Sequence, residues 1–290
     1  MSLIQATPTL EGFVPFPLAL VAVAAVGAVI GSFLNVVIHR VPREESIAFP
    51  SSHCPSCGAA IRPYDNIPIF SYLLLGGRCR SCRARIPVRY PAVEALTAAL
   101  FALTFLHTGL TLALPFDLVF VAIIISLVFI DAEHMILPDV INFPGLAFAL
   151  VARAVVPNLY GVGSLAEGAL QGWPVWAISL VGALLGALLG GGSLWLVGWL
   201  WEHVRGVEAM GLGDVKMMLM VGAYLGWPLT ALTIFLGVLT GSIIGVALML
   251  RRGERDMQML LPFGIFLGLG AIISLLAGTA IVNWYVGQFQ

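Results

Sequence analysis

Charged residues are scarce in this chain of 290 residues: Asp, Glu, Lys and Arg together make up 10% of it, whereas 60% is hydrophobic. So little charge argues against one or two soluble domains and predicts an all-α polytopic membrane protein in a lipid bilayer. The net charge of -1 says little, because in such a protein the positions of the charges matter more than their sum. No nucleotide-binding fingerprint is recognisable, and we expect no nucleic-acid partner.

Basic residues are few outside one polar segment, which holds more than half of them. Eight of the 14 Lys and Arg residues fall between Arg40 and Arg89, and the same stretch holds all 4 cysteines. The first dozen residues contain neither Lys nor Arg, so they lack the basic start of a cleavable signal peptide. We interpret them as a short external tail.

Apolar runs near the length that a bilayer requires, about 20 residues, occupy most of the remaining chain. They predict about eight transmembrane helices, at residues 13–38, 91–107, 112–130, 140–157, 174–201, 214–227, 229–250 and 262–286. The expected organisation is therefore an external tail with the first transmembrane helix (1–38), a small polar domain (39–90) and a transmembrane bundle (91–290).

The distribution of basic residues orients this bundle. If residues 40–89 are cytoplasmic, every Lys and Arg except Arg153 falls on the cytoplasmic side of an eight-span path. Both chain ends are then external. The acids Asp131, Asp139 and Asp214 then lie at the cytoplasmic edge of the bundle.

The four cysteines form two Cys-x-x-Cys pairs, Cys54 with Cys57 and Cys79 with Cys82. Two such pairs are typical of a structural zinc site, because each pair supplies two thiolates to one side of a tetrahedron. Two disulfides are the alternative. The predicted cytoplasmic location favours zinc, because the cytoplasm is reducing.

Two aspartates stand at comparable ends of apolar runs. Asp131 ends the uncharged run that begins at Leu118, and Asp214 follows a pair of glycines in Gly211-Leu212-Gly213-Asp214. Acids at membrane depth are costly unless they are used, and two at matching depth suggest an aspartic catalytic dyad. The alternative for Asp214 is an ordinary helix N-cap. Asp139 is a rival for a catalytic role, but Pro138 before it and an apolar run after it are typical of a helix start, so we interpret Asp139 as a helix cap with a secondary role at most.

Polar residues flank the cysteine segment where the chain leaves and re-enters the membrane. Asn35 and Arg40 end the first predicted span, and Arg89 precedes the second. Glu94 lies about one turn inside that second span, where an acid needs a partner. A structural ion pair with Arg40 or Arg89 is the alternative to a functional role.

Several motifs together resemble the bacterial type 4 prepilin peptidases, which are inner-membrane aspartic proteases of the Gly-x-Gly-Asp class. In chain order they are Gly31-Ser32-Phe33-Leu34-Asn35, the paired Cys-x-x-Cys, Asn66-Ile67-Pro68, Arg89-Tyr90-Pro91 with Glu94, Ile130-Asp131, Leu137-Pro138-Asp139, Gly211-Leu212-Gly213-Asp214 and Pro262-Phe263-Gly264. One departure is Ile265, where a second proline is expected.

The resemblance implies a two-step enzyme of the inner membrane, with its zinc domain and active site at the cytoplasmic face. It would cut the short basic leader from type 4 prepilins and pseudopilins and then methylate the new N-terminal residue, usually Phe, with S-adenosylmethionine. Asp131 and Asp214 would be catalytic, and Cys54, Cys57, Cys79 and Cys82 would bind structural zinc. Glu94, Asn35, Arg40 and Arg89 are candidates for the methylation site.

Two other classes of protein share some of these features. A transporter also uses intramembrane acids for proton coupling, but here both acids lie at one edge and no series of acids crosses the bundle. A zinc-domain scaffold would use its aspartates only as helix caps. Cleavage of a prepilin by the purified protein separates the three classes, because only a peptidase shortens the substrate.

Overall fold

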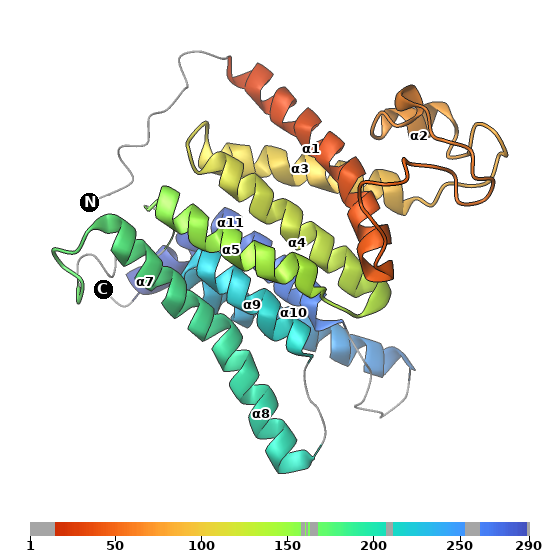
Figure 1. Ribbon diagram of the computed structural model, residues 1–290. Helices are drawn as coiled ribbons and strands as arrows, with labels where there is room; N and C mark the ends of the chain where they lie inside the picture. The colour runs from red at the N-terminus through yellow and green to blue at the C-terminus, as the bar shows by residue number, and fades with distance from the viewer. Residues whose placement is uncertain are drawn as a thin grey trace. The chain divides into compact units, whose positions relative to one another are not determined.

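The structure is a computed structural model that describes residues 15–157, 160, 162, 168–206, 211–252 and 262–288 (Figure 1). The regular elements in these residues are all helices, and apart from them the residues form two isolated β-bridges. This confirms the predicted all-α fold. The predicted external tail lies outside the described residues. The chain falls into two compact units with a boundary between Ser126 and Leu127, inside helix α4 (Leu114–His134), and each unit is described by itself.

The N-terminal unit is built on two apolar helices, α1 (Phe16–Arg40) and α3 (Arg89–Thr108), which pack along each other. Glycines on α1 allow this close approach. A Cβ atom at Gly27 would lie 2.8 Å from the Cα atom of Ala98, and one at Gly31 would lie 2.7 Å from that of Glu94. The packing therefore brings the backbone of α1 directly against the helical turn that carries Glu94.

The polar segment between α1 and α3 contains only short elements: η1 (Val41–Arg43), η2 (Pro63–Asp65) and α2 (Phe70–Leu74). Each Cys-x-x-Cys pair lies in a tight turn closed by a β-bridge, His53 to Ala60 in one turn and Arg78 to Arg85 in the other. Such a small segment buries little apolar surface, which is why a metal is expected to hold it together.

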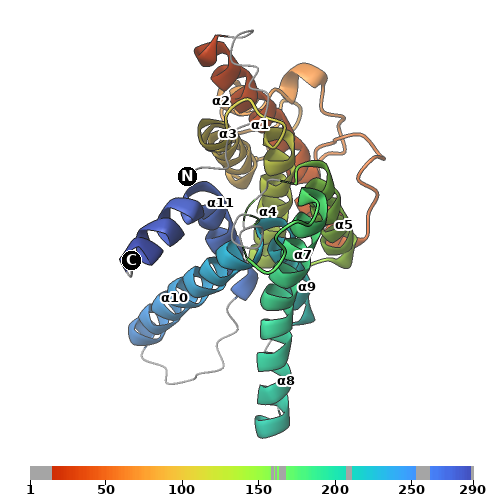
Figure 2. The same ribbon diagram turned by 90° about the vertical axis from the view of Figure 1, so that its left-hand side faces the viewer.

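The C-terminal unit contains α5 (Asp139–Val155), α7 (Val175–Ala187), the π-helical turn η3 (Leu188–Gly192), α8 (Ser193–Arg205), α9 (Leu212–Leu225), α10 (Trp227–Arg252) and α11 (Phe263–Gly287). Helix α9 contacts α5, α7, α8, α10 and α11, and its residues from Met220 to Leu225 are all buried. Figure 2 shows α9 among its neighbours, whereas α8 extends away from them. The short helix that begins with the Gly-x-Gly-Asp motif is therefore the core of this unit.

Glycines let the backbone of α9 contact the backbone of α7 directly. A Cβ atom at Gly186 of α7 would lie 2.0 Å from the carbonyl oxygen of Gly222, and one at Gly222 would lie 2.1 Å from that of Gly186. In the π-helical turn, a Cβ atom at Gly190 would lie 2.3 Å from the Met218 carbonyl oxygen. No residue other than glycine fits these positions without a shift of the helices.

Arg153 is fully buried near the opposite end of α9 from Asp214. Its Nε atom donates to the Ala223 carbonyl at 3.3 Å and its Nη1 atom donates to the Tyr160 carbonyl at 2.6 Å. The C-terminal carbonyls of a helix attract a cation, because they are unpaired and lie at the negative end of the helix dipole. The sequence shows Arg153 only as an exception to the charge bias, whereas the structure shows that it holds the end of α9.

The described part of each of the eight predicted spans is largely helical, and six helices among the described residues are long and apolar enough to cross a membrane. The other two are α5, with 17 residues, and α9, with 14 residues. The sharp division between α9 and α10 occurs at Gly226, which has a φ of 76°. A Cβ atom there would lie 2.6 Å from Nη2 of Arg153, so both the turn and the buried guanidinium require glycine.

Candidate active site

Asp131 lies in the last turn of α4 and is 5% exposed. Its carboxylate faces the first turn of α11, where the backbone N–H groups of Ile265 and Gly264 are next to it. A Cβ atom at Gly264 would lie 2.8 Å from Oδ2 of Asp131, so this glycine makes room for the carboxylate. Oδ2 has no hydrogen-bond partner among the described residues. A buried carboxylate oxygen of this kind requires a proton or a water molecule.

Asp214 lies in the first turn of α9 and is half-buried. The N-cap of this helix is Gly211, and no side chain caps it. The structure therefore rejects the alternative that Asp214 is an ordinary N-cap. Its carboxylate interacts electrostatically with that of Asp131, so the two predicted catalytic residues meet in the C-terminal unit although 83 positions separate them in the chain.

The two carboxylates lie where α9 and α11 begin. The N-terminus of a helix presents unpaired N–H groups and the positive end of the helix dipole. Two such ends stabilise one negative charge on the pair, whereas two negative charges on carboxylates that interact with each other are unfavourable. The arrangement therefore favours one ionised and one protonated carboxyl group, which is the state that an aspartic protease uses to activate water.

A sharp turn after α4 completes this site. Met135 has a φ of 54°, and its N–H donates to the carbonyl oxygen of Asp131 at 2.9 Å. Leu137 then reaches both glycine motifs: its Cβ atom lies 2.9 Å from a Cβ position at Gly213, and its Cδ1 atom lies 3.1 Å from one at Gly264. Leu137 thus packs between the starts of α9 and α11 and fixes their spacing.

Asp139 interacts with Lys216 rather than with the two predicted catalytic aspartates. Its carboxylate accepts hydrogen bonds from Nζ of Lys216 at 2.7 and 2.8 Å, and it is exposed. The prediction that Asp139 caps α5 is wrong, because Pro138 is the N-cap and no side-chain cap is formed. The ion pair instead joins the starts of α5 and α9.

The four cysteines come together as predicted, with their Sγ atoms all within 4.8 Å of one another. The Sγ atoms of Cys54 and Cys82 are 3.8 Å apart, which is too long for a disulfide. Zinc bound at about 2.3 Å by four thiolates places pairs of sulfur atoms at about this separation, so the four residues fit such a metal. Hydrogen bonds from the backbone N–H groups of Cys82 and Ser81 lower the pKa of the Cys79 thiol to about 7, which favours the thiolate that a metal needs.

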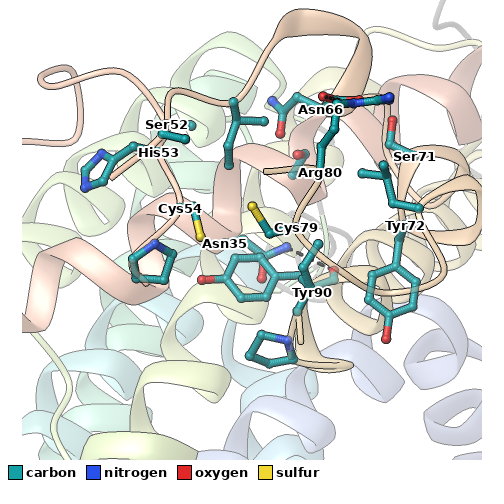
Figure 3. A pocket seen from close by; sticks show the side chains of 18 of the residues that line it. Asn35, Ser52, His53, Cys54, Asn66, Ser71, Tyr72, Cys79, Arg80 and Tyr90 are labelled. Carbon is teal, nitrogen blue, oxygen red and sulfur yellow. Dashed lines mark hydrogen bonds and ion pairs between the residues drawn. The ribbon is translucent and has the colours of Figure 1, made fainter. Parts of the chain in front are cut away.

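A cavity of about 400 Å³ lies in the N-terminal unit, between the cysteine turns and the helices α1 and α3. Figure 3 shows Cys54 and Cys79 on one side of it and Asn35 and Tyr90 on another. Its size is that of a small-molecule site, and polar groups converge on it. Asn35, Arg40 and Glu94 line it, so the structure brings three of the four predicted methylation residues together.

Glu94 connects α3 to the polar segment. Its Oε2 atom accepts the backbone N–H of Ile69 at 2.7 Å, and Ser32 of α1 also forms a hydrogen bond with its carboxylate. Ile69 has a φ of 61°, which is a strained conformation for a β-branched residue. Strain of this kind persists only where the surrounding structure maintains it, and it concentrates at functional sites.

The other three predicted residues have mainly architectural contacts. Nδ2 of Asn35 donates to the carbonyl oxygens of Tyr90, at 3.0 Å, and Gly31, at 3.3 Å. Arg40 donates to the carbonyl oxygens of Ser46 and Pro50, so its guanidinium orders the loop after α1. Arg89 does not line the cavity; its guanidinium lies 4.8 Å from the ring centroid of Tyr90, which does.

Sequence reasoning missed other residues of the cavity wall. Asp65 accepts hydrogen bonds from Arg80, including one from Nε at 2.8 Å, and this contact holds the pKa of the Asp65 carboxyl below its ordinary value. Tyr72 lines the cavity beside the second cysteine turn. No linear motif marks these residues; only the folding of the segment between α1 and α3 brings them to one wall.

The chain belongs to the type IV leader peptidase family. Residues 118–246 match the family of that description, and residues 25–108 match the bacterial peptidase A24 N-terminal domain. These two ranges contain both predicted catalytic aspartates and all four cysteines. The family membership predicted from the sequence motifs is confirmed.

Relatives match over nearly the full chain. A prepilin leader peptidase/N-methyltransferase from Pseudomonas aeruginosa is 38% identical over 303 residues, covering 96% of this chain and 98% of that protein. Proteins of the same name from Aeromonas hydrophila and Dichelobacter nodosus are each 35% identical, covering 90% and 91% of this chain. No solved structure matches the chain. These relatives confirm the prediction of an enzyme that combines peptidase and methyltransferase activities.

Proposed function

We propose that this protein cleaves the leader peptide of type 4 prepilins and pseudopilins with Asp131 and Asp214, and then methylates the new N-terminal amine with S-adenosylmethionine bound in the cavity of the N-terminal unit. The observation that carries the peptidase step is the meeting of two aspartates at the starts of two helices, where neither serves as a helix cap. The names of the relatives support both steps. The substrates are membrane proteins, and the site is proposed to lie at the cytoplasmic face of the inner membrane.

Cleavage uses the unequal protonation of the pair. The ionised carboxylate takes a proton from a water molecule, whose oxygen attacks the peptide carbonyl, while the protonated partner donates to the carbonyl oxygen. The peptide C–N bond then breaks, and the leaving nitrogen takes up a proton to become the new N-terminal amine. A Cβ position at Gly211 meets nothing closer than Oδ2 of Asp214, at 3.8 Å, so this glycine leaves space beside Asp214 for an extended peptide backbone.

Methylation needs a neutral amine and a carboxylate that can take its proton. S-adenosylmethionine supplies a methyl group from its sulfonium, and the carbon–sulfur bond breaks as the carbon–nitrogen bond forms. Glu94 is the acceptor proposed for the proton that the amine loses, because its carboxylate lines the cavity between α1, α3 and the cysteine turns. Asp65 is a poorer candidate because Arg80 already binds its carboxylate through two nitrogen atoms.

We expect Glu94→Gln to lose methylation of an already cut pilin by ~10² to 10⁴-fold, the usual contribution of a general base. Leader cleavage stays within about twofold of wild type, since the catalytic aspartates are unchanged. The amide oxygen of Gln can still accept the Ile69 N–H, so the melting temperature should not fall. Methyl transfer from labelled donor to uncut and pre-cut pilin measures both steps. A Glu94→Gln enzyme with full methylation removes the proposed base.

Glu94→Ala is the control that separates chemistry from architecture. It removes the acceptor of the strained Ile69 N–H as well as the base, and leaving a buried donor unpaired costs about 1–3 kcal/mol. The melting temperature of this variant should therefore fall, whereas that of Glu94→Gln should not. If both variants melt equally low, loss of methylation reports a damaged fold rather than a missing base.

The cysteine turns are proposed to hold one structural zinc ion per chain. Cys79→Ser should lower the zinc content measured by elemental analysis to below ~0.1 per chain, because the metal supplies much of the folding energy of so small a segment. The segment should become sensitive to protease, and methylation should fall because Cys54 and Cys79 form a wall of the cavity. Cleavage should persist. Ser81→Ala, between the second pair of cysteines, should keep its zinc. Active wild-type protein without zinc contradicts the proposal.

A further inference from the structure

A second cavity, of about 360 Å³, adjoins the first in the N-terminal unit. The two cavities share five lining residues, namely Ser32, Val36, Arg40, Ser52 and Asn66. The rest of the smaller cavity is mostly apolar and comes from two places, the face of α1 that carries Val29 and Phe33 and the loop that contains Ile47 and Ala48. The larger cavity is lined by charged and polar groups, so the two differ in the chemistry they can bind.

The smaller cavity opens where the protein presents apolar surface. Val29 and Phe33, on the membrane-spanning helix α1, are 59% and 47% exposed. The loop beside them exposes Ile47 and Phe49, at 47% and 79%. Exposed apolar side chains on a loop that follows the basic end of a transmembrane helix are typical of the membrane interface. The smaller cavity is therefore reached from the bilayer.

The wall between the cavities leads to Glu94. Ser32 borders both cavities, and its side chain forms a hydrogen bond with the Glu94 carboxylate. Arg40, in the same wall, uses its guanidinium to hold the carbonyl oxygens of Ser46 and Pro50 at 2.8 and 2.7 Å. It therefore shapes the loop side of the smaller cavity. Only the side chain of Ser32 therefore separates a group in the smaller cavity from Glu94.

We propose that the smaller cavity is the subsite for the side chain of the substrate's new N-terminal residue, an apolar side chain of about the size of Phe that enters from the bilayer. The inference rests on the proposed methylation in the larger cavity. The methyl donor is polar and arrives from water, whereas the amine begins an apolar helix and arrives from the membrane. With the side chain in the smaller cavity, the amine lies beside Ser32 and reaches Glu94.

Two valines on α1 provide a matched test. Val29 lines the smaller cavity, whereas Val26 lines neither cavity, and the two are 59% and 52% exposed. Full-length Val29→Trp and Val26→Trp enzymes are reconstituted in vesicles and assayed for methylation of pre-cut pilins that begin with Phe or with Ala. Affinity for S-adenosylmethionine is measured separately by titration calorimetry.

Val29→Trp should lower kcat/KM for the Phe pilin by about 10-fold or more, in the range by which an apolar pocket distinguishes side chains, and should lower it much less for the Ala pilin. Donor affinity should stay unchanged, and Val26→Trp should behave as wild type. Ala48→Trp, on the loop side, should repeat the Val29→Trp result.

An equal loss for both pilins, unchanged methylation of both, or a loss of donor affinity would each show that the smaller cavity does not bind the substrate side chain. A wild-type enzyme that does not bind the donor overturns the proposed methylation site itself, and the titration shows this before any variant is compared. The two failures are therefore distinguishable.

Discussion

Replacement of either catalytic aspartate by asparagine should abolish leader cleavage. Asn keeps the size of the side chain but cannot exchange a proton, so Asp131→Asn and Asp214→Asn should each lower the cleavage rate by at least ~10³-fold. The double variant should be little slower than either single one, because the two carboxyl groups act as a unit. The measurement is the rate at which full-length prepilin loses its leader in a detergent extract or in vesicles.

Asp139→Asn is the matched control. It is a third aspartate in the same unit, but it is exposed and pairs with Lys216, and an ion pair at the surface contributes about 1 kcal/mol or less. Cleavage by this variant should stay within about threefold of wild type. The Asp131 and Asp214 variants should still methylate pilin supplied already cut. Leader removal by the Asp214→Asn enzyme would end the assignment of the dyad.

Gly186→Ala should destabilise the C-terminal unit strongly. The added Cβ atom would lie 2.0 Å from the Gly222 carbonyl oxygen, so α7 and α9 must move apart. Overpacking of this kind typically costs about 1–3 kcal/mol, and contact with backbone rather than with a flexible side chain places this change at the upper end or beyond. Because α9 carries Asp214, cleavage should fall together with the melting temperature.

Gly192→Ala provides the comparison. This glycine lies at the end of the same helical region, and a Cβ atom there has no neighbour within 4 Å. Alanine should be neutral or should stabilise the protein by up to about 1 kcal/mol, because it favours the helical conformation. The melting temperatures of the purified variants test the pair. If Gly186→Ala melts at the wild-type temperature, the close contact between α7 and α9 is absent in the membrane.

The positions of the helices could be predicted from the sequence because apolar runs and their interruptions are local signals. The turn at Gly226 between α9 and α10 is an example. The extent to which a helix is buried is not a local property. Both α9 and α10 are apolar runs, yet α9 is enclosed by five helices, whereas α10 exposes Phe235, Val238 and Leu250.

The candidate catalytic and metal-binding residues could be proposed from the sequence because each belongs to a short motif with a chemical purpose. The Cys-x-x-Cys pairs and the Gly-x-Gly-Asp motif are examples. Contacts between a side chain and a backbone group distant in sequence could not be predicted. Glu94 accepts the N–H of Ile69, 25 residues earlier, and Arg153 holds the carbonyl oxygen of Ala223, 70 residues later. In each pair a side chain binds a backbone group. Every residue has these backbone groups, so the sequence does not show which of them the side chain will bind.

The shortness of α9 has a consequence for the depth at which its proposed catalytic residue would lie in a bilayer. Its 14 residues extend about 21 Å at 1.5 Å per residue, whereas the hydrocarbon core of a bilayer is about 30 Å thick. A helix that falls short by ~9 Å either starts below the membrane surface or thins the lipid around it. We therefore expect Asp214, in its first turn, to lie at the floor of a depression, where the protein rather than bulk solvent controls the supply of water. Under the proposed peptidase function, the scissile bond would be drawn down into this depression as an unwound strand, and peptide unfolding at the membrane surface would be part of substrate selection.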